Sequence, residues 1–84
     1  MVDFELSTHA RDMLRERNIP EEWVWRTLDN PDNKRLGADQ NTHYTKAIIE
    51  YDMRILRVVV NQNALPYRIV TIFFDRRLSK KAGN

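Results

Sequence analysis

Hydrophobic residues recur at helical spacing near the start of the chain. Ala10, Met13 and Leu14 fall on one face between Ser7 and Arg17, and charged residues fill most of the remaining positions. This pattern is typical of an amphipathic helix packed on a core. Ser7 is the expected N-cap, because its hydroxyl can accept a hydrogen bond from a free N–H of the first turn.

The end of this helix is also readable. With Arg17 as C-cap, Asn18 occupies the position that often turns left-handed, and Ile19 follows where a Schellman ending places an apolar residue against Leu14. Pro20 fits the first position of a second helix, which we expect to extend to about residue 29. The sequence therefore predicts two helices that meet at a tight corner.

The pattern changes to strands in the second half of the chain. Three runs rich in β-branched residues, His43–Tyr51, Ile55–Val60 and Arg68–Phe74, are separated by short turns, and Lys34–Leu36 is a candidate fourth strand. Short connections make neighbouring strands antiparallel. We therefore expect an α+β fold in which two N-terminal helices pack on one face of a three- to four-stranded antiparallel sheet.

Alternation along the middle run assigns the two faces of this sheet. Leu56, Val58 and Val60 form one wholly apolar face that should lie under the helices, which leaves Arg57 on the other face. The core predicted in this way comprises Leu14, Val24, Leu28, Leu56, Val58, Val60, Val70 and Ile72.

Length and composition narrow the class of protein. Eighty-four residues without cysteine predict one small domain, over residues 1–75, and exclude disulfides and thiol catalysis. Residues 76–84 are expected to form a basic, flexible tail. No apolar run approaches the length of a membrane span, so we expect a cytoplasmic protein with no membrane contact.

Charge divides the chain into two unequal halves. Residues 1–42 carry a net charge of −3 and residues 43–84 a net charge of +5. The second half is the candidate anion-binding half, although a lopsided solvated surface would have the same composition.

No self-contained catalytic motif is present, so the two histidines are the candidate acids or bases. His9 lies in the first turn of the first helix, where the helix dipole favours the neutral, proton-accepting form. His43 opens the first long strand. The alternative is that His9 is a capping or boundary histidine packed against the sheet and that His43 is simply exposed. No cofactor is implied, and the carboxylate spacing suggests no metal site.

Residues of the strands could form a phosphate- and base-binding surface. Alternation could place Tyr44, Lys46, Arg57, Thr71 and Phe73 together on the face away from the helices. Cations would hold a phosphate there and an aromatic ring would stack on a base. An uncovered sheet face is polar in any case, which explains the lysine and the threonine, but explains Arg57 within an apolar strand less well.

The order of these residues resembles a small bacterial family of unknown function that is placed near the RelE-like and BrnT-like toxins. The resemblance rests on Ser7-x-His9-Ala10, Arg17-x-Ile19, Asn30-Pro31-Asp32, Leu56–Val60 and Ile69–Ile72, and spans about residues 4–74. It implies two helices on an antiparallel sheet. His9, Arg17, Arg57 and Thr71 match the family's helix histidine, helix-end arginine, strand arginine and last-strand threonine.

Toxins of this kind are ribonucleases neutralised by a partner antitoxin. The resemblance therefore implies a metal-independent endoribonuclease that acts on RNA, with ribosome-associated mRNA as one substrate and a cognate antitoxin as partner. In this hypothesis His9 or His43 is the acid or base, Arg57 and Thr71 complete the catalytic set, and Arg17, Tyr44, Lys46 and Phe73 bind RNA. The alternative is a non-catalytic protein-interaction module with a degenerate RelE-like fold.

Overall fold

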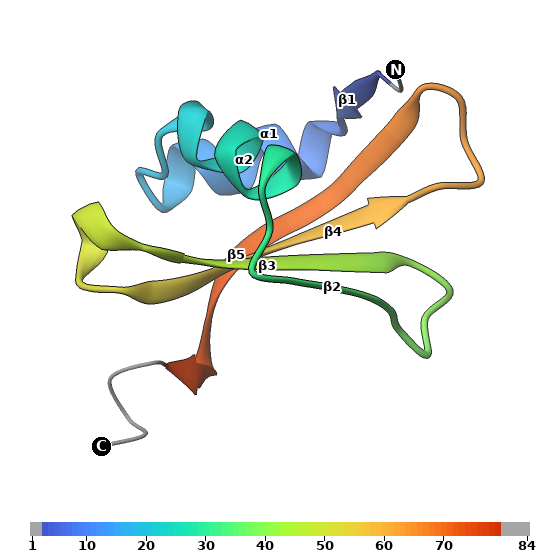
Figure 1. Ribbon diagram of the computed structural model, residues 1–84. Coiled ribbons are helices and arrows are strands. Elements are labelled where there is room, and N and C mark those ends of the chain that lie inside the picture. The colour runs from blue at the N-terminus through green and yellow to red at the C-terminus, as the bar shows by residue number, and fades with distance from the viewer. Residues whose placement is uncertain (1–2, 80–84) are drawn as a thin grey trace.

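Two short helices lie on one side of a twisted sheet in the computed structural model, which describes residues 3–79 (Figure 1). The elements in chain order are β1 (Phe4–Leu6), α1 (Thr8–Glu16), α2 (Glu21–Asp29), β2 (Asn33–Leu36), β3 (Thr42–Ile48), the 3₁₀ turn η1 (Ile49–Tyr51), β4 (Arg54–Asn61) and β5 (Tyr67–Ser79). The α+β class and the two helices on one face are as the sequence predicts.

The sheet has more strands than expected and is not purely antiparallel. Its order is β1-β5-β4-β3-β2, and β1 pairs with β5 in parallel while all other pairs are antiparallel. The expectation of a three- to four-stranded antiparallel sheet is therefore corrected to a five-stranded mixed sheet. β1 was not predicted, because three residues are too few to show a strand period.

The corner between the helices has the predicted Schellman geometry. Asn18 is left-handed, with φ of 53°, and the Ile19 N–H donates to the Leu14 carbonyl at 2.9 Å. The Ser7 hydroxyl caps α1 by accepting from the Ala10 N–H at 3.0 Å. Pro20 is one position earlier than expected, because it is the extended N-cap of α2 and the helix begins at Glu21.

The core lies between the helices and the face of the sheet that carries Leu56, Val58 and Val60, as predicted. Leu14 is only partly buried, and Val70 is half-buried and outside the core cluster. Ile69 takes the core position because the β4–β5 register shifts between Val59 and Val60. A one-residue shift moves a side chain to the other face of a strand.

β5 extends further than the sequence indicates. The strand expected to end at Phe74 continues to Ser79, so Arg76 to Ser79, which we expected in the tail, belong to the sheet; residues 80–84 lie outside the described residues. In Figure 1 this last part of β5 turns away from the side that carries the helices.

The β4–β5 ladder is interrupted in the same region. Leu56 pairs with Phe74, but the next pair is Arg54 with Ser79, so Ile55 alone on β4 faces Asp75 through Leu78 on β5. We call this segment, residues 75–78, the β5 bulge. Bulges bend a strand and redirect its side chains, and they are common next to functional sites.

Candidate functional site

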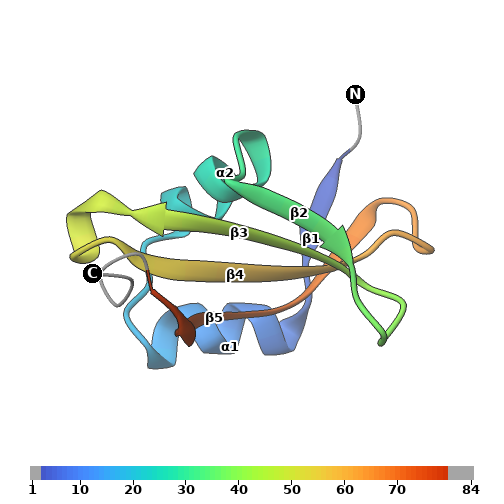
Figure 2. The ribbon, with the colours of Figure 1, turned by 60° about the horizontal axis from the view of Figure 1, so that its bottom comes forward.

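The side of the sheet without helices carries a cluster of polar side chains that are joined by hydrogen bonds and ion pairs. Directly paired residues of antiparallel strands point to the same face. Arg57 is paired with Phe73, and Val59 is paired with both His43 and Thr71. The register therefore brings Arg57, His43, Thr71 and Phe73 to one face, which is turned toward the viewer in Figure 2.

Tyr44 and Lys46 were predicted for this face, and that prediction is wrong. They pair with Val58 and Leu56, whose side chains point toward the helices. Tyr44 is buried in the core, and the Lys46 ammonium donates to the Asn30 carbonyl at 2.9 Å. The even-numbered residues of β3 belong to the helix side, because the hairpin fixes a register that the sequence alone did not specify.

Arg57 is the buried cation of the site. It is 8% exposed although no helix covers its face, because the β5 bulge folds over it and Leu78 shares a small cavity with it. Its guanidinium forms an ion pair with Asp75, in which Nε and Nη2 lie 3.0 and 2.8 Å from Oδ2. A buried arginine in an apolar strand needs such a carboxylate.

Asp75 stabilises the β5 bulge in addition to binding Arg57. Its Oδ1 accepts a hydrogen bond from the Arg77 backbone N–H at 3.0 Å, which fixes the bend in β5. Burial acts to raise the pKa of Asp75, but the hydrogen bond from Arg77 and the ion pair with Arg57 outweigh it, so that the pKa lies below its usual value. The pair is therefore ionised at neutral pH.

His43 lies between Arg57 and a second carboxylate. The Arg57 Nη1 is 3.0 Å from His43 Nδ1, and His43 Nε2 is 3.1 Å from both carboxylate oxygens of Asp39. Arginine can only donate, so Nδ1 is the acceptor and Nε2 carries the hydrogen that Asp39 accepts. The two neighbours thus fix one tautomer of a neutral imidazole, with its lone pair on the Arg57 side.

The β2–β3 loop positions Asp39 for this contact. The Gly37 N–H donates to the Asn41 carbonyl at 2.8 Å, and Asp39 Oδ1 accepts from the Asn41 N–H at 3.0 Å. The hydrogen bond from the Asn41 N–H lowers the pKa of Asp39, and the contact with His43 lowers it further. Gly37 is required here because a Cβ at its position would be 2.6 Å from His43 Nε2.

A pocket of about 360 Å³ opens above His43 and Arg57, and we call it the His43 pocket. Arg35, Arg77 and Phe73 also line it, together with residues 37–39 of the loop. Arg35 and Arg77 are exposed, so they can reach a ligand without losing buried contacts. Three guanidinium groups beside an oriented imidazole and a ring can hold a phosphate and accept a proton.

The other predicted site residues lie elsewhere or take no visible part. His9 is exposed on α1, and because the helices cover the opposite face of the sheet, it is not brought together with Arg57 (Figure 1). Arg17 is exposed at the end of α1. Thr71 shares the face of Arg57 and is half-buried.

The two carboxylates of the site, Asp39 and Asp75, were not predicted from the sequence. Asp75 could have been found, because Arg57 needs a buried partner and only Glu50, Asp52 and Asp75 are acidic beyond residue 42. Asp39 gave no such signal, since its role depends on the loop geometry. Among residues 3–79, no group of three or more histidine and acidic side chains is arranged to hold a metal ion.

Three further findings concern the class and the family of the protein. Within residues 3–79, no helix has both the length and the apolar character that a membrane span requires. Neither the curated proteins nor the solved structures contain a significant match. A family model described as "Domain of unknown function (DUF4258)" matches residues 6–74, which is most of the chain. The protein therefore belongs to the DUF4258 family.

Proposed function

We propose that the protein is a metal-independent endoribonuclease whose active site is the His43 pocket. One observation carries this proposal: His43 is oriented by Asp39 on one nitrogen and by Arg57 on the other, at the base of a pocket lined by three arginines. The resemblance to RelE-like and BrnT-like toxins supports the same chemistry. An RNA substrate also agrees with the cytoplasmic location expected from the sequence.

The proposed reaction uses His43 as the general base. When an RNA phosphate oxygen becomes the acceptor for Arg57 Nη1, His43 Nδ1 is released and takes the proton of the 2′-hydroxyl, while Arg57 Nε and Nη2 stay on Asp75. The 2′-oxygen attacks the adjacent phosphorus, the bond from phosphorus to the 5′-oxygen breaks, and the leaving oxygen takes a proton from water. Asp39 stabilises the imidazolium that forms, as the carboxylate of a catalytic triad does.

The arginines supply the positive charge that this reaction needs. Charge accumulates on the phosphate oxygens in the transition state, and donors fixed in advance stabilise it most. Arg57 is the fixed donor because Asp75 holds it on a rigid strand, and Arg35 and Arg77 are the exposed cations that would capture the phosphate. Phe73 offers a ring for a base.

The direct test is cleavage of single-stranded RNA by the purified chain in the presence of a chelator. We expect products that end in a 2′,3′-cyclic phosphate, and no cleavage of the same oligonucleotide with 2′-deoxy sugars. A second assay, without the chelator, should include translating ribosomes, because toxins of this type include ribosome-dependent enzymes and ribosomes need Mg²⁺. Salt-sensitive RNA binding without cleavage in either format would contradict the proposal and favour the non-catalytic interaction module.

A cognate antitoxin is part of the same proposal. A protein that blocks the His43 pocket would protect the host RNA from cleavage. Co-expression with a neighbouring small gene should then relieve any growth defect that the chain causes.

Gly37→Ala is predicted to slow cleavage without unfolding the protein. The added methyl group would meet His43 Nε2 at 2.6 Å and Asp39 Oδ1 at 2.8 Å, so the imidazole and the carboxylate must separate. Displacement of a catalytic group by about 1 Å can cost up to about 10²-fold in rate. Cleavage kinetics measured beside a thermal melt will check this, and an unchanged rate would show that the contact with Asp39 is not needed.

A further inference from the structure

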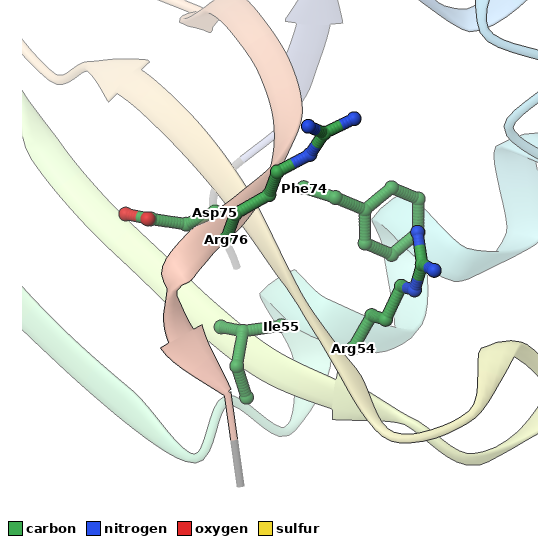
Figure 3. A pocket seen from close by; sticks show the side chains of 5 residues that line it. All are labelled: Arg54, Ile55, Phe74, Asp75 and Arg76. Carbon is green, nitrogen blue, oxygen red and sulfur yellow. The ribbon is translucent and has the colours of Figure 1, made fainter. Parts of the chain in front are cut away.

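A second pocket, of about 450 Å³, opens at the β5 bulge, and we call it the bulge pocket (Figure 3). Arg54 and Ile55 of β4 line it together with Phe74, Asp75 and Arg76 of β5. It exists because the β4–β5 ladder is interrupted between the Leu56–Phe74 and Arg54–Ser79 pairs. Its volume lies within the range of pockets that bind small ligands.

The bulge pocket has positive charge without a matching negative charge. Among residues 3–79, neither Arg54 nor Arg76 forms an ion pair, and both side chains are exposed. Asp75 lines the pocket, but Figure 3 shows its carboxylate directed away from Arg54 and Phe74, and it is already bound by Arg57 and Arg77. These two guanidinium groups, which have no carboxylate partner in the described part of the chain, therefore favour an anionic ligand.

Phe74 and Arg54 of the bulge pocket are in contact with a cluster of aromatic rings. The Arg54 guanidinium lies 4.8 Å from the centre of the Tyr51 ring. Tyr51 in turn stacks on Trp23 and meets the edge of Phe74, at ring-centre distances of 6.0 and 4.8 Å. The cluster limits the motion of Arg54 and presents a guanidinium beside a ring. Nucleic-acid bases stack on both kinds of surface.

We propose that the bulge pocket binds one nucleotide unit, with the base packed against Arg54 and Phe74 and the phosphate paired with Arg76. The ligand can be a free nucleoside monophosphate or one nucleotide of a single-stranded RNA. Its assignment as an RNA subsite next to the His43 pocket rests on the proposed function, whereas nucleotide binding itself does not. Asp75 lines this pocket and is paired with Arg57 of the His43 pocket, so the Arg57–Asp75 ion pair links the two sites.

Tryptophan fluorescence can test the proposal, because Trp23 contacts both Tyr51 and Phe74. In a Trp25→Phe background Trp23 is the only tryptophan of the chain. The protein is titrated with adenosine 5′-monophosphate, with adenosine, with inorganic phosphate, and with a 2′-O-methyl oligoadenylate that cannot be cleaved through its 2′-oxygen. We expect the monophosphate to change Trp23 emission and to bind more tightly than adenosine or phosphate alone.

Substitutions then assign the contacts. Arg54→Ala should weaken binding of the monophosphate about tenfold or more, as loss of one stacking partner does. Arg76→Ala should remove the preference for the monophosphate over adenosine. Arg11→Ala is the matched control, because Arg11 is also an exposed arginine without an ion pair among residues 3–79 but lies on α1. It should leave the titration unchanged.

The outcomes separate the ligand sources and the two proposals. If the oligoadenylate binds more tightly than the monophosphate, and Arg54→Ala weakens that binding, the pocket is an RNA subsite. If the monophosphate binds as tightly as the oligoadenylate, the pocket is a site for a free nucleotide. Nucleotide binding that depends on Arg54, in a protein that cleaves no RNA, would overturn the proposed ribonuclease function and support the nucleotide site in the bulge pocket. Absence of nucleotide binding, or equal binding by wild type and Arg54→Ala, would overturn the nucleotide site.

Discussion

His43→Ala should lower the rate of RNA cleavage by about 10²–10⁴-fold, the usual contribution of a positioned acid or base. His43 is the only described histidine in contact with the candidate phosphate-binding groups, through Arg57 at 3.0 Å. RNA affinity should change little, because Arg35, Arg57 and Arg77 remain. Single-turnover cleavage and a filter-binding assay on the same samples measure the two quantities.

His9→Ala is the matched control for this prediction. It removes the only other histidine, which is exposed on α1 on the opposite side of the sheet. Its rate and melting temperature should equal those of the wild type. A large loss of cleavage in His9→Ala, with His43→Ala active, would move the active site to α1 and contradict the proposed function. The His43→Ala protein, purified in parallel, also reports any contaminating ribonuclease.

Local signals in the sequence were sufficient to predict the two helices and to assign the residues of β4 to the two faces of the sheet. The Schellman corner at Asn18 depends on neighbouring residues only, and β4 alternates without interruption from Leu56 to Val60. β1 was not predictable, because it is three residues long and pairs with a strand more than sixty positions away. The full length of β5 was not predictable either, because the β5 bulge interrupts the two-residue alternation of the strand.

The candidate site was predicted only in part, because it depends on register and on a loop. Arg57 stood out within an apolar strand, and Phe73 and Thr71 do share its face. The register of β3 decided the rest: it brought His43 to Arg57 and sent Tyr44 and Lys46 to the helix side. A shift of one residue reverses every side chain of a strand, so no composition argument could choose between these outcomes.

Asp75→Ala should destabilise the protein by about 3–5 kcal/mol, the usual cost of leaving a buried charge without its partner. Arg57, which is 8% exposed in the wild type, would have no carboxylate against its Nε and Nη2, and the Arg77 backbone N–H would lose its acceptor, Asp75 Oδ1. The total free energy of unfolding of a native protein is about 5–15 kcal/mol, so this loss would be a large part of it. Urea denaturation followed by circular dichroism measures the loss.

Glu50→Ala is the matched control, because it removes another arginine–carboxylate pair with two short contacts, this one at the surface. Arg26 Nη1 and Nη2 lie 2.7 and 2.8 Å from the Glu50 carboxylate, and hydrogen bonding to Arg26 lowers the pKa of Glu50 to about 2. Water screens this exposed pair, so its loss should have a much smaller effect than the loss of Asp75. Equal effects of the two substitutions would show that burial does not strengthen the Arg57–Asp75 pair.

A double substitution and a pH series complete the argument about Asp75. Arg57→Met with Asp75→Leu removes both charges, and we expect it to be more stable than Asp75→Ala alone. The pKa of Asp75 is lower in the folded protein than in the unfolded chain. Its contribution to stability is therefore fully present above about pH 4, the pKa range of an unfolded aspartate, and is lost as the pH falls through the depressed pKa. The stability difference between wild type and Asp75→Ala should shrink over that acidic range, and a difference that stayed constant would mean that the ionised carboxylate is not what holds Arg57.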